Sequence, residues 1–152
     1  AGRYADRGLR PVRRPAALPG GMVGRIHDAL RAKRPARSDT QRFLLRYLTE
    51  PKAQVVFERP ARPLGAQRFA LVAARSGIEL ARPTRMMYAG RAMGVNGECV
   101  NVPAGCAEAL RALADRRALA ASAVARLPLA AHALLHDWYT AGWLQPGGGE
   151  SR

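Results

Sequence analysis

The sequence is short of acidic residues, cysteine and long apolar runs, and each shortage excludes a class of protein. Only 11 of the 152 residues are Asp or Glu, against 25 Lys or Arg, and the scattered acids form no paired carboxylates for general acid–base catalysis. Two cysteines do not make a disulfide framework, which favours a reducing, cytoplasmic setting. No apolar run reaches the length of a membrane span, so no membrane partner is expected.

Lysine is scarce too, so the formal net charge of +14 comes almost entirely from arginine. Residues 1–63 hold 15 basic and 5 acidic side chains, a net +10, whereas residues 64–152 hold 10 and 6, a net +4. A surface this basic attracts phosphate backbones and releases counterions when it binds them. A GC-rich genome would enrich Arg together with Ala, Gly and Pro in any protein, so the charge alone leaves both interpretations open.

The N-terminal part predicts an arm followed by two helices. Residues 1–20 are rich in Arg and Pro and predict an extended arm, because proline blocks helix formation. A four-residue apolar spacing predicts a short helix that ends before Pro35. A second helix, capped by Ser38 or Asp39, ends near Glu50. Their apolar residues are Met22, Ile26 and Leu30 on the first helix, and Phe43, Leu44 and Tyr47 on the second.

The middle of the chain predicts a boundary and then a hairpin. Residues 54–57 look like a strand, and the prolines that follow it mark the boundary between a helical N-terminal part and a C-terminal module. Residues 69–74 fit either a strand or a helical turn. The pair Asn96-Gly97 predicts a two-residue hairpin with residues 98–102 as its return strand, because a type I′ turn needs positive φ at both positions.

Three helical patterns complete the chain. Pro103 opens the first, residues 119–127 form the second, and Pro128 is the first residue of the third. Gly142 ends the third helix, and an apolar edge strand begins at Trp143. A hairpin, three short helices and a closing strand are the arrangement of a winged-helix module, which predicts an α+β fold with a small antiparallel sheet.

No catalytic residue and no metal ligand is predicted. His132 and His136 share a helix face, but Ala133 stands where the metalloprotease pattern needs Glu, and no further ligand completes a set. Residues 129–137, where a DNA-reading helix would lie, contain no Arg or Lys. A groove-reading helix presents basic and amide side chains, so the sequence argues against direct reading of bases.

Several blocks of sequence resemble bacterial cupin/JmjC-type ribosomal oxygenases. In the N-terminal half the blocks are RYAD (residues 3–6), LRP (9–11), LP (18–19) and FLLRYLTEPK (43–52), which resemble the segment that follows the jelly-roll core. In the C-terminal half they are TRMMY (84–88), NGE (96–98) and WYTAG (138–142), which resemble the winged helix. The resemblance covers nearly the whole chain.

This resemblance implies a division of the chain. Family members are Fe(II)- and 2-oxoglutarate-dependent protein hydroxylases with a jelly-roll, dimerisation helices and a winged helix. Residues 1–59 would be the arm and helical dimerisation region, residues 60–146 the winged-helix domain, and residues 147–152 a flexible tail. The family's iron ligands, a His-x-Asp pair and a distant His, have no counterpart here, because the sequence contains no His-x-Asp or His-x-Glu. His27 is followed directly by Asp28, which is the wrong spacing. Iron and 2-oxoglutarate would therefore be bound in the parent protein and not in this chain.

The resulting hypothesis is a non-catalytic C-terminal region that pairs two subunits and positions a ribosomal protein or rRNA. It predicts a cytoplasmic homodimer, and whether the chain has any enzyme activity of its own stays open. The predicted dimer contacts are Met22, Ile26, Leu30, Phe43, Leu44 and Tyr47. The alternative is a free-standing, basic winged-helix protein that binds nucleic acid.

Overall fold

The helices and strands alternate along the chain in the manner of an α+β protein. The computed structural model describes residues 14, 16–31 and 36–148. Its elements are α1 (Gly20–Leu30), α2 (Arg37–Thr49), α3 (Ala66–Ser76), β1 (Ile78–Leu80), β2 (Met86–Ala89), β3 (Ala92–Val95), β4 (Glu98–Val100), α4 (Ala107–Arg116), β5 (Ala118–Leu119), α5 (Ala121–Val124), α6 (Leu129–Thr140) and β6 (Leu144–Pro146). The predicted fold class is confirmed, with two small antiparallel sheets where one was expected.

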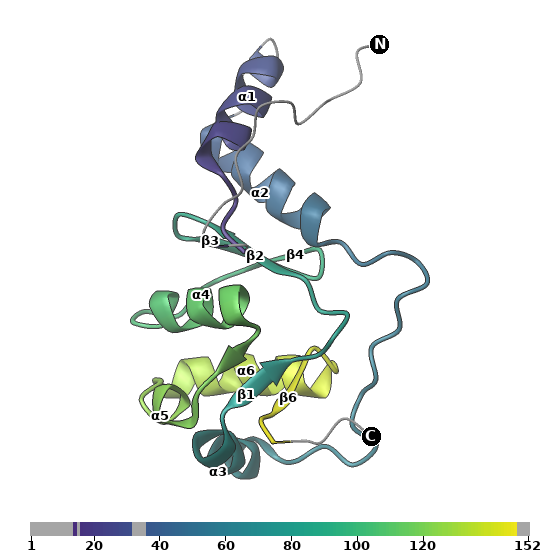
Figure 1. The fold of residues 1–152 in the computed structure, drawn as a ribbon, viewed down its shortest axis with the longest axis vertical. Coiled ribbons are helices and arrows are strands. Elements are labelled where there is room, and N and C mark those ends of the chain that lie inside the picture. Colours follow the sequence, from purple (N-terminus) through teal and green to yellow (C-terminus); the bar gives the residue numbers. More distant parts are fainter. Residues whose placement is uncertain (1–13, 15, 32–35, 149–152) are drawn as a thin grey trace.

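The elements stack in layers along the molecule. Figure 1 shows α1 and α2 at one end and α3, α5 and α6 at the other, with the β2–β3–β4 sheet and α4 between them. Residues 50–65 contain no helix or strand and run along one side of the molecule from α2 to α3. The predicted boundary at residue 59 falls in this connecting segment, although α2 also packs on the sheet that follows it.

The β2–β3–β4 sheet is built around the predicted hairpin. Asn96 and Gly97 have φ values of 47° and 86°, so the two-residue turn is confirmed, and Val95 pairs with Glu98 across it. The return strand is shorter than predicted, because β4 ends at Val100. The pairing Met86↔Val95 aligns β2 with β3.

One glycine allows α2 to lie close to this sheet. A Cβ on Gly94 would stand 2.9 Å from both the Cβ and the carbonyl oxygen of Leu45, so only glycine leaves room for the helix. Because side chains alternate along a strand, the neighbours Met93 and Val95 point to the opposite face, where both are buried in the main core. The sheet therefore has α2 on one face and the main core on the other.

The second sheet closes the C-terminal half. Its order is β5–β1–β6, so the central strand β1 precedes both of its neighbours in sequence. Ile78 pairs with Leu119 and Leu80 with Leu144, and all four side chains are buried. The helix α3 packs against α5 and α6 beside this sheet. In the sequence, the β2–β3–β4 sheet and α4 therefore lie between β1 and β5, two strands that pair with each other.

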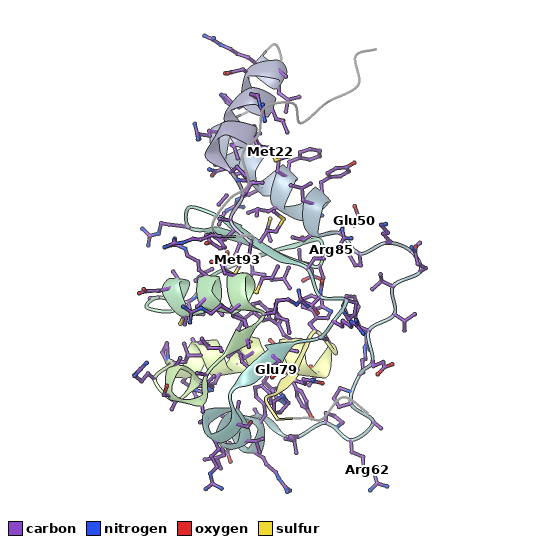
Figure 2. The ribbon with its side chains drawn as sticks, in the orientation of Figure 1. Met22, Glu50, Arg62, Glu79, Arg85 and Met93 are labelled. Carbon is purple, nitrogen blue, oxygen red and sulfur yellow. The ribbon has the colours of Figure 1, made fainter. Side chains whose placement is uncertain are left out.

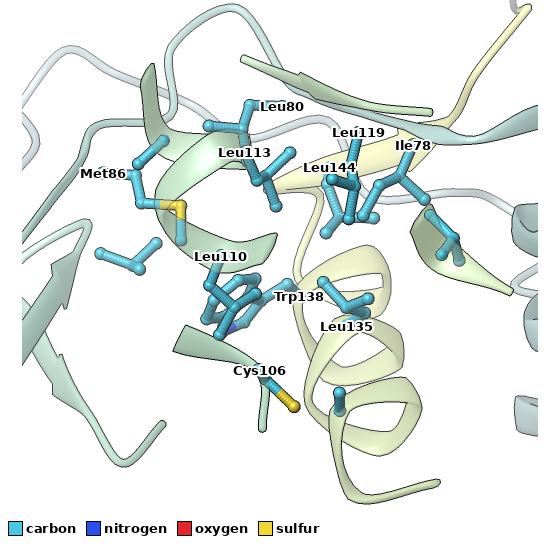
Figure 3. Close-up of a cluster of buried hydrophobic side chains, with 14 of the residues drawn as sticks. Ile78, Leu80, Met86, Cys106, Leu110, Leu113, Leu119, Leu135, Trp138 and Leu144 are labelled. Carbon is cyan, nitrogen blue, oxygen red and sulfur yellow. The ribbon is translucent and has the colours of Figure 1, made fainter. Parts of the chain in front are cut away.

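The main core lies where α4, α6 and the two sheets meet. Figure 3 shows Leu110 and Leu113 of α4 together with Leu135 and Trp138 of α6 in this cluster. All four are at most 4% exposed. A second, smaller cluster fills the space between α1, α2 and the sheet, and its buried members are Leu18, Val23, Leu44, Leu45 and Ala89.

Several predicted helix limits are wrong by a few residues, for local reasons. The helix expected from Pro103 begins at Ala107, because residues 103–106 first form a turn closed by Cys106 N–H and the Pro103 carbonyl at 3.2 Å. Pro128 is the N-cap of α6 and not its first residue. Ser38 lies inside α2, and the Asp39 carboxylate instead accepts a 3.3 Å hydrogen bond from the backbone N–H of Ala36.

Longer-range pairing explains the other corrections. Residues 54–57 do not form a strand, because Val56 is 80% exposed and no strand pairs with them. Residues 69–74 belong to helix α3, which buries Phe69 and Ala73, one turn apart. The helix expected over residues 119–127 shrinks to α5, because Leu119 pairs with β1. Gly142 has φ 78° directly after α6, which confirms it as the terminator, and the closing strand begins one residue late, at Leu144. Only residues 147 and 148 of the predicted tail lie within the described residues.

Candidate interaction surfaces

The helix pair α1–α2 carries all six of the predicted dimer contacts. Leu44 is 4% exposed and belongs to the cluster that attaches α2 to the sheet. Met22 and Ile26 are half-buried and pack against the same cluster from α1, and Figure 2 shows Met22 at this end of the molecule. Leu30, the last residue of α1, is also half-buried. Leu44, Met22 and Ile26 thus contribute to packing within the chain.

The other two predicted contacts lie on the open face of α2. Phe43 and Tyr47 are 56% and 63% exposed, although they are large and apolar. Their rings stack with centroids 5.9 Å apart and planes 9° apart, as the four-residue spacing on a helix allows. They line a shallow groove of about 440 Å³ whose other lining residues are Asp39, Arg42, Arg46, Glu50 and Gly97. An aromatic pair edged by charges of both signs has the composition of an interaction surface.

Thr49 fixes the end of α2 that carries this pair. Its side chain is fully buried, and its hydroxyl donates a 2.6 Å hydrogen bond to the carbonyl of Leu45. The same hydroxyl accepts a 2.9 Å hydrogen bond from the backbone N–H of Gly97 at the hairpin tip. The aromatic pair is therefore presented by a helix attached at its C-terminal end to the sheet.

His136 and His27 make separate contacts in different parts of the structure. His136 Nε2 lies 2.9 Å from the carbonyl oxygen of Leu64, and its ring packs against Phe69. His27 Nδ1 lies 3.5 Å from the Thr40 hydroxyl at the other end of the molecule. Across residues 14, 16–31 and 36–148, no three His, Cys, Asp or Glu side chains gather so that they could hold a metal ion. The described residues thus do not fit the iron site of a 2-oxoglutarate-dependent hydroxylase.

The two cysteines differ in exposure. Cys99 is exposed on β4, with its sulfur 3.6 Å from the carbonyl oxygen of Arg42. Cys106 is fully buried just before α4, and burial raises the pKa of its thiol. Cys106 therefore behaves as a small core residue, since a protonated, buried thiol is a poor nucleophile.

The outer face of α6 carries no positive charge. Its exposed residues are Leu129, Ala130, Ala133 and Asp137, and Leu129 is 85% exposed. Phosphate and base contacts need donors, which this face does not supply. The exposed face of α6 therefore presents no arginine or lysine.

A polar contact that the sequence did not reveal holds the residues before α1 against the core. Asp115 of α4 accepts hydrogen bonds from the backbone N–H of Ala16 at 3.1 Å and from the hydroxyl of Tyr88 at 2.9 Å. The Arg111 guanidinium lies 5.6 Å from the centre of the Tyr88 ring. Burial, and then the hydrogen bond to Asp115, raise the pKa of Tyr88. Residues 16–18 also hydrogen-bond to the backbone of Tyr88, so they cover the edge of β2.

No helix within the described part of the chain has the length and apolar character that crossing a membrane requires.

Comparisons with known proteins match the architecture. A family model described as ROXA-like winged helix matches residues 28–145. Among solved structures, YcfD, a ribosomal oxygenase from Escherichia coli, matches with a TM-score of 0.66 and 18% identity over 97% of this chain and 41% of that chain. YcfD in complex with cobalt and succinic acid gives 0.65 and 18% over 95% and 40%. YcfD with cobalt and 2-oxoglutarate gives 0.63 and 17% over 95% and 40%.

The identities and coverages of these matches determine what can be concluded from them. At 17–18% identity the likeness establishes the fold. The chain spans only 41% of the length of the YcfD chain. The comparison with curated proteins gives no match.

Proposed function

The chain belongs to the ROXA-like winged-helix family, and on that premise we propose that it is the dimerisation and positioning region of a ribosomal oxygenase-like protein. The Fe(II)- and 2-oxoglutarate-dependent chemistry would take place elsewhere in the parent protein, because the described residues provide no ligand set. The role of this region would be to pair two subunits and to present a ribosomal protein or rRNA to the enzyme. The match to YcfD over 97% of the chain supports the assignment, because it includes the helix pair as well as the winged helix.

The observation that carries the dimer proposal is the exposed stack of Phe43 and Tyr47. A buried aromatic side chain removes about 150–250 Å² from water, so two rings that are more than half exposed leave roughly 200 Å² of apolar surface uncovered. A two-fold dimer buries this surface on both subunits, roughly 400 Å² in all. At about 25 cal/mol per Å², the gross gain is roughly 10 kcal/mol, which is enough to offset much of the cost of association.

The charges around the stack are compatible with a two-fold contact. Asp39 and Glu50 line the groove together with Arg42 and Arg46, so each subunit offers both signs at the same surface. In a two-fold interface the same surface meets itself, and such a surface can pair its own acids with its own bases. The net charge of +14 per chain opposes association, so dimerisation should strengthen as salt rises toward the physiological range.

Sedimentation velocity of the intact chain tests this proposal. We expect a dimer at micromolar concentration, and a monomer when Phe43 and Tyr47 are both changed to Ala. The matched control is Leu71→Ala, which truncates an equally exposed side chain on α3 (63% exposed) and should leave the dimer intact. A wild-type chain that is monomeric up to about 100 µM, well above the dissociation constants of stable dimers, would refute the proposal.

The alternative function, nucleic-acid binding, is favoured by one other groove. A cavity of about 630 Å³ beside β4 is lined by Arg42 and Arg91 together with the polar side chains of Ser38, Gln41 and Asn101. A phosphate backbone in this groove would give a steep loss of affinity with salt. Titration of a duplex and of a single-stranded RNA with increasing salt tests it. A shallow salt slope, or binding unaffected by Arg42→Gln and Arg91→Gln together, would exclude this groove.

A further inference from the structure

The hairpin sheet has one covered edge and one open edge. The backbone of residues 16–18 covers β2, with Leu18 N–H donating to the Tyr88 carbonyl at 2.8 Å and Tyr88 N–H donating to the Ala16 carbonyl at 3.0 Å. At the opposite edge, β4 pairs with β3 alone among the described strands. An open edge strand offers unpaired backbone groups to another extended chain.

The register shows which backbone groups of β4 are available. In a two-residue hairpin the pair that flanks the turn, here Val95 and Glu98, is hydrogen-bonded. Hydrogen-bonded and non-hydrogen-bonded pairs alternate along an antiparallel ladder, so the next pair, Gly94 and Cys99, is not. The N–H and C=O of Cys99 therefore point away from β3 toward the open edge.

A groove lies beside this edge. It measures about 290 Å³ and runs between β4 and α6. Its walls are mainly apolar, with the partly exposed Trp143 and Leu134 and the edge of the buried Trp138. The other lining residues are Glu98, Cys99 and Val100 of β4, with Asp137 and Ala141 of α6. A helix beside an open strand edge is a setting in which proteins accept an extended peptide as an added strand.

The negative charge of the groove favours a positively charged ligand. Glu98 and Asp137 are both exposed, one on each wall, and the lining contains no Arg or Lys. The protein as a whole is strongly basic, with 25 basic residues against 11 acidic ones. A phosphate backbone would be repelled at this position, whereas an arginine or lysine side chain would find a carboxylate on either wall and aromatic surface beneath it.

We propose that the groove between β4 and α6 binds an extended peptide segment rich in arginine or lysine, which adds to β4 as a fourth strand. The peptide backbone pairs with the N–H and C=O of Cys99. Alternate peptide side chains point into the groove, where cationic ones meet Glu98 and Asp137. This site is separate from the aromatic stack on α2, and the inference does not depend on dimerisation.

The groove contains its own spectroscopic probe. Trp138 and Trp143 are the only tryptophans in the chain, and both line it, so binding should change the intrinsic fluorescence. The probe ligand is a capped peptide of about six residues in which arginine and valine alternate, so that one set of side chains faces the groove. We expect saturable binding by the intact chain at low salt. The same peptide with glutamate in place of arginine should not bind.

Variants test separately the contacts to the two carboxylates and the backbone pairing with Cys99. Glu98→Gln together with Asp137→Asn should weaken peptide binding about ten-fold, since each exposed pair contributes a few-fold. Glu79→Gln, which removes one negative charge from an exposed position on β1, should leave binding unchanged. Cys99→Pro removes the outward N–H without breaking the pairing to β3, and should weaken binding about five-fold, whereas Cys99→Ser should not.

The same measurements can overturn the proposal. An RNA oligonucleotide that produces an equal or larger tryptophan change would show that the groove accepts polyanions. Peptide affinity that falls equally in Glu79→Gln and in the groove variants would show a general charge effect. Absence of binding up to about 1 mM peptide would exclude the site. Repeating the titration with the Phe43/Tyr47 double variant keeps this outcome independent of the dimer test.

Discussion

Replacing Thr49 by Val should detach the end of α2 from the hairpin tip. Thr49 is fully buried, and its hydroxyl links the Leu45 carbonyl to the backbone N–H of Gly97 at 2.6 and 2.9 Å. Valine keeps nearly the same shape but lacks the hydroxyl. The Leu45 carbonyl still has its helical partner, whereas the N–H of Gly97 loses the acceptor on α2. The cost should be about 1 kcal/mol, the usual net contribution of one hydrogen bond, because this contact is only part-buried.

Urea unfolding of the wild type and the variant measures this cost. We expect a lower midpoint with an unchanged slope, and a fall in Tm of about 2–4 °C for each kcal/mol in a chain of this size. The matched control is Thr140→Val, since the Thr140 hydroxyl donates only to the Asp137 carbonyl of its own helix, at 2.9 Å and at an exposed site. That change should stay within about 0.5 kcal/mol. Equal losses in the two variants would refute the argument that the contact between α2 and the hairpin carries the effect.

Three other features have measurable consequences. Gly94→Ala should cost about 1–3 kcal/mol by urea unfolding, because the new methyl group would overlap the backbone of α2, and an unchanged midpoint would contradict the close packing. Burial, followed by the hydrogen bond to Asp115, raises the pKa of Tyr88 above 10.0, so folding favours the neutral phenol. Its contribution should be complete below pH 10 and disappear as the pH rises through the folded-state pKa, and Tyr88→Phe should remove this loss from the pH dependence of stability. In the native chain Cys99 should react quickly with a thiol reagent and Cys106 only after denaturant is added; two fast thiols would contradict the burial of Cys106.

The features that the sequence predicts well are those specified locally. The pair Asn96-Gly97 fixes its turn through positive φ, and Gly142 ends α6 for the same reason. The strand expected at residues 54–57 and the helix expected from residue 119 fail because both depend on partners far away in the chain. Leu119 becomes a strand residue only because β1 pairs with it.

The candidate surface shows the same limit. Helix α2 has apolar residues at positions 43, 44, 45, 47 and 48, so their spacing does not reveal which of them face the chain's own core. Gly94 determines which face of α2 packs on the sheet, because the absence of a side chain at Gly94 lets Leu45 contact the sheet. Phe43 and Tyr47 then lie on the exposed face of the helix. The sequence around Gly94 does not distinguish a glycine that a helix packs against from a glycine that forms a turn.

The strand β4 explains why surfaces of opposite charge lie so close together. Side chains alternate along a strand, so Cys99 faces α2 with Gly94, while Glu98 and Val100 face the winged-helix half with their partners Val95 and Met93. The groove on the α2 side contains two arginines, and the groove on the α6 side contains two acids. A shift of one residue in the hairpin register would move Glu98 to the basic side and leave Asp137 as the only acid in the α6 groove. The turn at Asn96-Gly97 thus sets the fold of the sheet and also determines which partner each side of β4 is suited to bind.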